Sequence, residues 1–192
     1  MAETKMCNPA AIGLGGFAMT TMILQFHNLG WVGLAPVLWI GLAYGGTAQI
    51  VAGLLELDSG HNFGFSAFTS YGAFWIALCL YVIFGTNSAL VESYPVLKFG
   101  ANGLGWFLAV WGFYTLIMFI VSMKHHTCLA LLFLTLLLGF IGLTIKEFTG
   151  SEAIGTLAAW DLIVTALIAW YLMAHVIYED KGLHLPVGKP WI

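Results

Sequence analysis

The chain has 192 residues, a net charge of −3 and a mean hydropathy of +0.93. Hydrophobic residues make up 60% of it and charged residues only 8%, whereas a soluble domain carries roughly 25% charged residues. So few charges cannot cover a water-facing surface, and most of the surface must therefore face lipid. All six basic residues are lysines, and they form no basic field of the kind that nucleic-acid binding requires.

Six apolar stretches separated by short polar breaks predict an all-α integral membrane protein with six transmembrane helices in one bundle. Each stretch is close to the roughly 20 residues that a bilayer core demands. The predicted spans cover residues 9–25, 34–55, 66–84, 104–123, 128–145 and 153–178. The connections are too short to hold a soluble module, so residues 1–192 are predicted to form a single transmembrane domain.

An even number of spans places both termini on the same side of the membrane. By this count the terminal side carries Lys5, Lys124, Lys181 and Lys189, and the other side carries Lys98 and Lys146. Because loops rich in lysine stay in the cytoplasm, four lysines against two favour cytoplasmic termini.

The first span begins with Asn8-Pro9, a pattern typical of a capped helix start. Free N–H groups and partial positive charge at such a start suit a carboxylate ligand. Phe17 and Thr20 then share one helix face. An ordinary capped helix, with a packed Phe17 and a Thr20 that bonds its own backbone, explains the same pattern.

The second span has two informative faces. A stripe of small residues, indicative of close helix packing, consists of Gly41, Gly45, Ala48 and Ala52. Another face carries Gln49 and Glu56 with glycines between them. Polar groups in lipid usually face the bundle interior or a water-filled cavity, so both are candidate pathway residues. Glu56 also fits a carboxylate that lies in the interface at the helix end.

Spans three and six add further candidates. Tyr71 and Trp75 lie on one stripe of span three, where the Tyr71 hydroxyl needs a partner; a pore-lining role and a bond to a neighbouring helix both fit. Asp161 lies inside the apolar run of span six on the same stripe as His175. An intramembrane carboxylate indicates a functional site, but Asp161 is only about two turns from the helix start and could reach the interface.

Other patterns carry less weight. The adjacent pair His125-His126 does not match a metal-ligand spacing on one helix face, and Asp58 could simply hydrogen-bond His61 in the loop after span two. No hydrolase, metalloprotease or phosphate-loop motif occurs in the sequence. We therefore predict no metal, no cofactor and no enzymatic activity.

Several ordered motifs of the first three spans resemble the acetate uptake transporter family, also called the succinate–acetate permeases. The first motif is similar to the family's NPAPLGL signature, and the Asn, Gln, Glu and Tyr of the set are not what chance similarity between apolar helices would reproduce. The motifs are residues 8–14, 16–21, 44–49, 52–56 and 68–75, with a looser match at residues 111–116 and at Trp160.

The resemblance implies a hexameric ring in the cell membrane with one pore in each protomer. It also implies passage of acetate and related small carboxylates such as succinate, coupled to protons in several members. The family's hydrophobic constriction corresponds to Phe17, Tyr71 and, by alignment from Lys124, Leu136. Together, the residues and the resemblance give the candidate vestibule residues Asn8, Pro9, Thr20, Gln49, Glu56, Ser70 and Trp75.

The sequence departs from the family pattern in places. Ala11 stands where the signature has its second proline, and the loop at residues 58–62 has Asp and His where basic residues are usual. Two other classes of function stay open. One is a channel for a small neutral solute such as urea, because a narrow apolar pore also excludes ions. The other is a membrane scaffold that transports nothing.

Overall fold

The computed structural model describes residues 7–192. Lys5, one of the four lysines predicted to lie on the cytoplasmic side, is outside the described residues. The elements are α1 (Ala10–Asn28), α2 (Leu34–Ile40), η1 (Gly41–Ala48), α3 (Gln49–Asp58), α4 (Asn62–Gly85), α5 (Ser88–Ser93), η2 (Pro95–Leu97), α6 (Ala101–Ser122), α7 (Thr127–Thr149) and α8 (Glu152–Glu179). Because α2, η1 and α3 follow one another directly, they form one long helix. The described residues thus contain six helices long and apolar enough to span a membrane, and the predicted fold class is confirmed.

The six long helices match the thickness of a bilayer. The shortest, α1, has 19 residues and the longest, α8, has 28, which correspond to about 28 and 42 Å at 1.5 Å per residue. Most helix ends differ from the predicted spans by a few residues, in part because polar caps extend them. His126 Nδ1 accepts the Leu129 amide at 3.1 Å at the start of α7, and Ser151 Oγ accepts the Ile154 amide at 3.5 Å at the start of α8.

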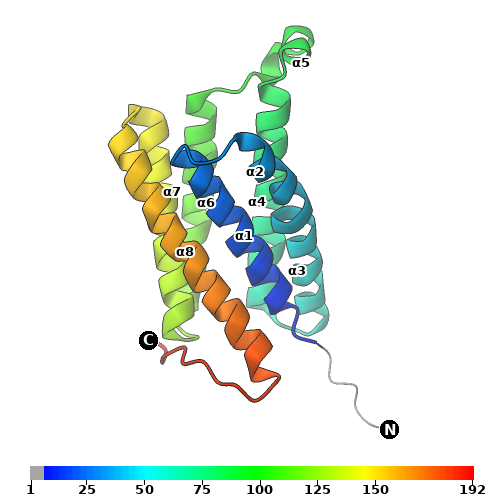
Figure 1. Ribbon diagram of the computed structural model, residues 1–192, viewed down its shortest axis with the longest axis vertical. Coiled ribbons are helices and arrows are strands. Elements are labelled where there is room, and N and C mark those ends of the chain that lie inside the picture. The colour runs from blue at the N-terminus through cyan, green and yellow to red at the C-terminus, as the bar shows by residue number, and fades with distance from the viewer. Residues whose placement is uncertain (1–6) are drawn as a thin grey trace.

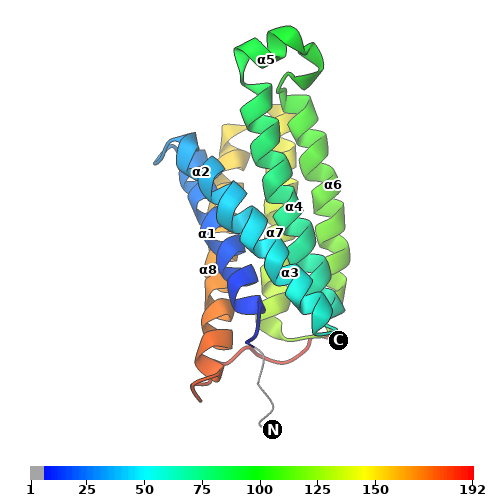
Figure 2. The same cartoon turned by 90° about the vertical axis from the view of Figure 1, so that its right-hand side faces the viewer.

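The long helices form a ring around a central axis (Figures 1 and 2). α1 packs along α8 on one side and against η1 and α3 on the other. α8 packs on α7, α7 packs on α6, and α3 packs on α4. The ring closes between α4 and α6, where large aromatic side chains rather than a close backbone approach fill the space.

This aromatic seam positions the centre of α4. The Phe74 ring stacks on Phe107 at 5.5 Å between centroids and meets the Trp111 ring edge-on at 5.3 Å. The Tyr71 ring lies 6.0 Å from Trp111 and 5.7 Å from Tyr114. Such edge-to-face pairs stabilise packing by about 0.5–1.5 kcal/mol each beyond the area they bury. The seam therefore fixes Tyr71 on the inner side of the ring.

The middle of the second long helix is an eight-residue π-helix, η1, which no pattern in the sequence predicts. Its wider turns bring the Thr47 hydroxyl within 2.9 Å of the Leu42 carbonyl oxygen five residues earlier. Gly45 lies so close to α1 that a Cβ there would overlap the Thr20 side chain. The glycines thus serve close packing, as their stripe predicted. Pi-helical turns are rare and are often found next to functional sites.

The C-terminal tail, residues 183–192, crosses from α8 to the turn between α6 and α7 (Figure 1). The Val187 carbonyl oxygen accepts the Cys128 amide at 2.9 Å, and the Lys189 carbonyl oxygen accepts the Thr127 hydroxyl at 2.8 Å. The Trp191 amide donates to the Met123 carbonyl oxygen at 2.9 Å. The tail and the start of α1 lie at the same end of the bundle, and the tail holds the turn at residues 123–126 in place.

Candidate functional site

A cavity of about 380 Å³ lies at the end of the bundle that holds the start of α1 and the C-terminal tail. We call it the terminal vestibule. Its wall comes from α1, α3, α4, α7, α8 and two interhelical turns. Among the lining residues are Asn8, Phe17, Gln49, Glu56, His61, Tyr71, His125, His126 and Leu136. Six of the ten pathway residues predicted from the sequence therefore surround one cavity.

Two further cavities continue toward the other end of the bundle. A central chamber of about 40 Å³ is lined by Phe17, Leu136 and other mostly apolar side chains. An opposite vestibule of about 370 Å³ extends to His27, Lys146 and Glu147 at the far end. The chamber and the opposite vestibule share the wall residues Leu24, Trp75, Leu78, Leu108 and Leu143. The three cavities are thus consecutive along the axis of the ring.

Phe17, Tyr71 and Leu136 lie where the terminal vestibule meets the central chamber. Phe17 and Leu136 line both cavities, and Tyr71 lines the vestibule. The Phe17 and Tyr71 rings meet edge-on with centroids 6.0 Å apart. Each of the three side chains is at most 5% exposed. Three helices thus bring the three predicted constriction residues to one level of the bundle.

The Tyr71 hydroxyl takes part in a short hydrogen-bond chain. It lies 2.8 Å from Thr115 Oγ1, which itself donates to the Trp111 carbonyl oxygen at 2.8 Å. Because the single hydroxyl hydrogen of Thr115 goes to Trp111, the Tyr71 hydroxyl is the donor to Thr115. Tyr71 therefore both lines the cavity and bonds a neighbouring helix. In this arrangement its oxygen has only lone pairs left to offer to a solute.

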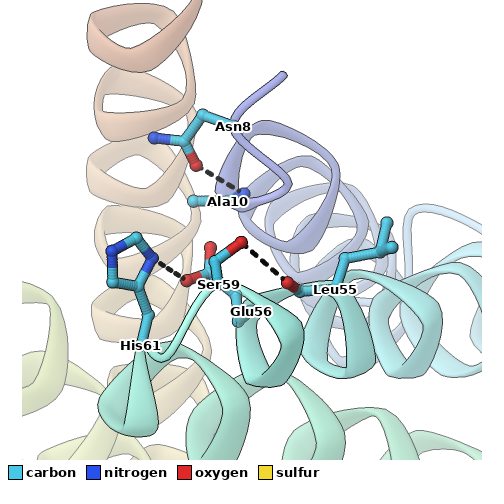
Figure 3. A network of polar contacts seen from close by, with 6 residues as sticks. All are labelled: Asn8, Ala10, Leu55, Glu56, Ser59 and His61. Atoms are coloured by element: carbon cyan, nitrogen blue, oxygen red, sulfur yellow. Dashed lines mark hydrogen bonds and ion pairs between the residues drawn. The ribbon is translucent and has the colours of Figure 1, made fainter. Parts of the chain in front are cut away.

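Glu56 is paired with His61 at the mouth of the vestibule (Figure 3). His61 Nδ1 lies 2.9 Å from Glu56 Oε2, so the partner of His61 is Glu56 and the interpretation of an Asp58–His61 bond was wrong. The cause is a Schellman turn at the end of α3. Gly60 adopts a φ of +76°, and the His61 amide donates to the Glu56 carbonyl oxygen at 2.9 Å. This turn folds His61 back over Glu56 rather than over Asp58.

Gln49 and Asn8 complete the polar part of the wall. Gln49 is 1% exposed, and its Oε1 has no hydrogen-bond partner among the described residues. Asn8 Oδ1 accepts the Ala10 amide at 2.9 Å (Figure 3), which is the predicted capping interaction at the start of α1. Pro9 has helical dihedral angles and lines none of the cavities.

The remaining predicted residues lie elsewhere. Thr20 is fully buried against Gly45 and lines no cavity. Ser70 Oγ accepts the Tyr114 hydroxyl at 3.0 Å between α4 and α6, also away from the cavities. Trp75 lines the central chamber and the opposite vestibule but not the terminal vestibule, and its Nε1 has no partner among the described residues.

The fold brings to the vestibule two histidines whose adjacent positions in the sequence suit no metal site. His125 and His126 come from the turn between α6 and α7 and line the same cavity as Glu56 and His61. Burial, and then the neighbouring His175 and His125 imidazoles, lower the pKa of His126. No group of three His, Cys, Asp or Glu residues in the described part of the chain is arranged to hold a metal ion. Only tertiary structure, not spacing along the chain, places these turns together.

The comparison with known proteins decides the family. The model of the GPR1/FUN34/yaaH family matches residues 1–188. The chain belongs to this family. The resemblance read from the motifs of the first three spans is thereby confirmed.

Individual members of the family extend the comparison. The succinate-acetate/proton symporter SatP of Escherichia coli (strain K12) is 40% identical over 98% of this chain and 99% of its own length. The Ammonia transport outward protein 2 of Saccharomyces cerevisiae is 34% identical over 87% of this chain and 60% of its own length. The structure of the bacterial acetate channel SatP matches this chain with a TM-score of 0.86 and a sequence identity of 37%. The match covers 96% of this chain and 100% of the channel's chain. The chain is therefore a multi-pass membrane protein with the fold of that channel.

Proposed function

We propose that this protein transports acetate and related small carboxylates, succinate among them, through a pore in each protomer. The observation that carries the proposal is the line of three cavities along the bundle axis, narrowed at Phe17, Tyr71 and Leu136. The similarity to a succinate-acetate/proton symporter and to an acetate channel supports the choice of substrate. In this proposal the side chains of Phe17, Tyr71 and Leu136 form the constriction, and Asn8, Gln49 and Glu56 form its polar approach.

The constriction favours a neutral solute over an anion. Moving a bare carboxylate past apolar side chains costs many kcal/mol unless donors replace water. Tyr71 is the polar residue at this level, and its hydrogen is held by Thr115. Its oxygen can accept a hydrogen bond from the O–H of a carboxylic acid but can donate none to a carboxylate. We therefore propose that the substrate passes this point in its protonated form, which makes the flux proton-dependent.

The test is uptake of labelled acetate into proteoliposomes, with and without an imposed proton gradient. Saturable uptake that increases when the outside is acidified is the expected result. Equal acetate flux from pH 5.5 to pH 8 at a matched acetate gradient would refute the proton-dependent step. No uptake under any condition would refute the choice of substrate.

A second candidate is a channel for a small neutral solute. The relative named for outward ammonia transport and the apolar lining of the central chamber favour it. Efflux of ammonia, or counterflow of labelled urea, from vesicles that move no acetate would select this alternative. A scaffold without transport finds less support, because Thr20 and Gln49 do not bond Tyr71 and the cavities are consecutive.

We further propose a homo-hexamer in the cell (inner) membrane with lipid around its outer face and both termini in the cytoplasm. The lysines of the described residues support this orientation, since Lys124, Lys181 and Lys189 lie toward the terminal end and Lys98 and Lys146 toward the other. Native mass spectrometry tests the number of subunits. Labelling of an introduced cysteine in the C-terminal tail, in intact and then in permeabilised cells, tests the orientation.

A further inference from the structure

Two polar side chains in the wall of the central chamber have no hydrogen-bond partner. Trp75 of α4 and Thr21 of α1 both line the chamber, and each is only 3% exposed. Neither Trp75 Nε1 nor Thr21 Oγ1 bonds another group within residues 7–192. Because buried polar groups in proteins are almost always hydrogen-bonded, the chamber is a place where a bound solute would complete two hydrogen bonds.

The third polar side chain of this wall already has partners. Gln25 Nε2 donates to the Thr21 carbonyl oxygen at 3.3 Å, and Gln25 Oε1 accepts Asn28 Nδ2 at 2.9 Å. The other residues that line the chamber are all Phe or Leu. Trp75 and Thr21 thus carry the unpaired polar atoms of an otherwise apolar wall.

The free hydroxyl of Thr21 departs from the usual state of a threonine inside a helix, which donates to the carbonyl oxygen four residues earlier. Threonines that make this bond, at 2.7–3.1 Å, are Thr86, Thr115, Thr135, Thr149 and Thr165. The buried hydroxyls of Thr20 and Thr69 do not, and they pack against Gly45 and Gly53 of the neighbouring helix. Thr21 lies instead beside a cavity, where its hydroxyl can turn toward a solute.

The two unpaired groups define the solute that fits them. The indole N–H of Trp75 is only a donor, whereas the hydroxyl of Thr21 both donates and accepts. A solute that completes both bonds therefore needs an acceptor for Trp75 with a second polar atom next to it for Thr21. A neutral carboxyl group has this pair in its C=O and O–H. A primary amide has the same pair in its C=O and N–H, and it stays neutral across the physiological pH range.

The size of the chamber narrows the class further. Its volume is about 40 Å³, and since one water requires about 10–15 Å³ of cavity, it has room for about three water-sized groups. A carboxyl or carboxamide group is of this size. The alkyl part of the solute can extend into the opposite vestibule, which shares the apolar wall residues Leu24, Leu78 and Leu143 with the chamber.

We propose that the central chamber is a binding site for neutral carboxyl and carboxamide groups, and that the protein therefore also transports small primary amides such as acetamide. Trp75 donates to the C=O of the solute, and Thr21 is the partner of its O–H or N–H. The constriction admits an amide as well, because the Tyr71 oxygen accepts a hydrogen bond from an N–H as it does from an O–H. This inference rests on the pathway of the transport function proposed above, but not on acetate as its substrate.

Uptake of labelled acetamide into proteoliposomes at pH 5.5 and pH 8 tests the site, with labelled acetate measured in parallel and the flux into protein-free liposomes subtracted. Thr21→Val removes the hydroxyl at nearly constant volume, Thr21→Ser keeps it, and Trp75→Phe removes the indole N–H. Thr144→Val is the matched control. The Thr144 hydroxyl is likewise buried and unpaired in the described part of the chain, but Thr144 lines none of the cavities.

We expect saturable acetamide uptake by the wild type that is equal at pH 5.5 and pH 8, and that unlabelled acetate inhibits more strongly at pH 5.5. Loss of one hydrogen bond should lower uptake at subsaturating acetamide about fivefold in Thr21→Val and in Trp75→Phe. Thr21→Ser and Thr144→Val should keep the wild-type rate. No saturable acetamide uptake, or an equal loss in Thr21→Val and Thr144→Val, would overturn the site. If Trp75→Phe fails to fold, as judged by size-exclusion chromatography, the comparison of Thr21→Val with Thr21→Ser decides.

The parallel measurement of acetate keeps this proposal apart from the transport of carboxylates. Acetate uptake without acetamide uptake would overturn the chamber site and leave carboxylate transport intact. Acetamide uptake that depends on the Thr21 hydroxyl, in vesicles that take up no acetate, would support the chamber site and overturn acetate as a substrate.

Discussion

Replacing Tyr71 by Phe removes one oxygen from the constriction and leaves its ring in place. The variant loses the hydrogen bond to Thr115, which keeps its own donor bond to the Trp111 carbonyl oxygen. No buried donor is left without a partner, so the expected loss of stability is about 0.5–1.5 kcal/mol. In the variant, a protonated acid that crosses the constriction also lacks the hydrogen bond that the Tyr71 oxygen would accept, and this bond is of similar strength. At about 1 kcal/mol this lowers the flux of the neutral acid about fivefold.

The assay compares acetate uptake at pH 5.5 and pH 8 in proteoliposomes. Tyr71→Phe should be about fivefold slower than wild type at pH 5.5, and by the same factor at pH 8, where the flux of both proteins is low because little neutral acid exists. Tyr171→Phe is the control, since it removes a hydroxyl that bonds the Pro186 carbonyl oxygen at 2.7 Å, away from the cavities. An unchanged rate of Tyr71→Phe at pH 5.5, or an equal loss in Tyr171→Phe, would refute the acceptor role. Tyr71→Ala should instead widen the constriction, weaken the pH dependence and destabilise the fold by about 3–5 kcal/mol.

Three further substitutions test separate parts of the structure. Burial lowers the pKa of His126, so the fold is most stable above about pH 6.5 and loses stability as the pH falls through the lowered pKa. His126→Asn keeps a cap for the Leu129 amide, and it should flatten the dependence of the thermal unfolding temperature on pH. Gly45→Val should force Thr20 and α1 outward and cost about 1–3 kcal/mol in denaturant unfolding, whereas an unchanged midpoint would contradict the close approach. Glu56→Gln should lower the KM for acetate at pH 7.5 about fivefold, because it removes the repelling charge; a raised KM would show that Glu56 helps to bind substrate.

Much of the architecture could be predicted from the sequence because each span contains enough local information. The length of an apolar run sets the number of crossings, and the number of crossings places the termini together. Helical spacing alone placed Gln49 and Glu56 on one face, and both line the terminal vestibule. Phe17, Tyr71 and Leu136 came from the family resemblance rather than from spacing.

The rest depends on contacts between elements that are distant in sequence. The π-helix of η1 arises where Gly45 packs against Thr20 of α1, and no spacing within span two reveals it. His125 looked unimportant because an adjacent histidine pair suits no metal site on one helix. It lines the same cavity as the Glu56–His61 pair because the packing of the helices brings two distant turns to one end of the bundle. The Glu56–His61 bond itself needs the positive φ of Gly60.

A carboxylate that enters either vestibule as an anion must become neutral before it passes Tyr71 in the proposed pathway. Entry into a vestibule and passage through the constriction are therefore successive steps, separated by a proton transfer. A change in the wall of the vestibule from which the substrate enters acts on the first step and should alter KM with little effect on the maximal rate. A change at Tyr71 acts on the second step and should alter the maximal rate with little effect on KM. Kinetics in which both variants change the same parameter would show that one site performs both steps.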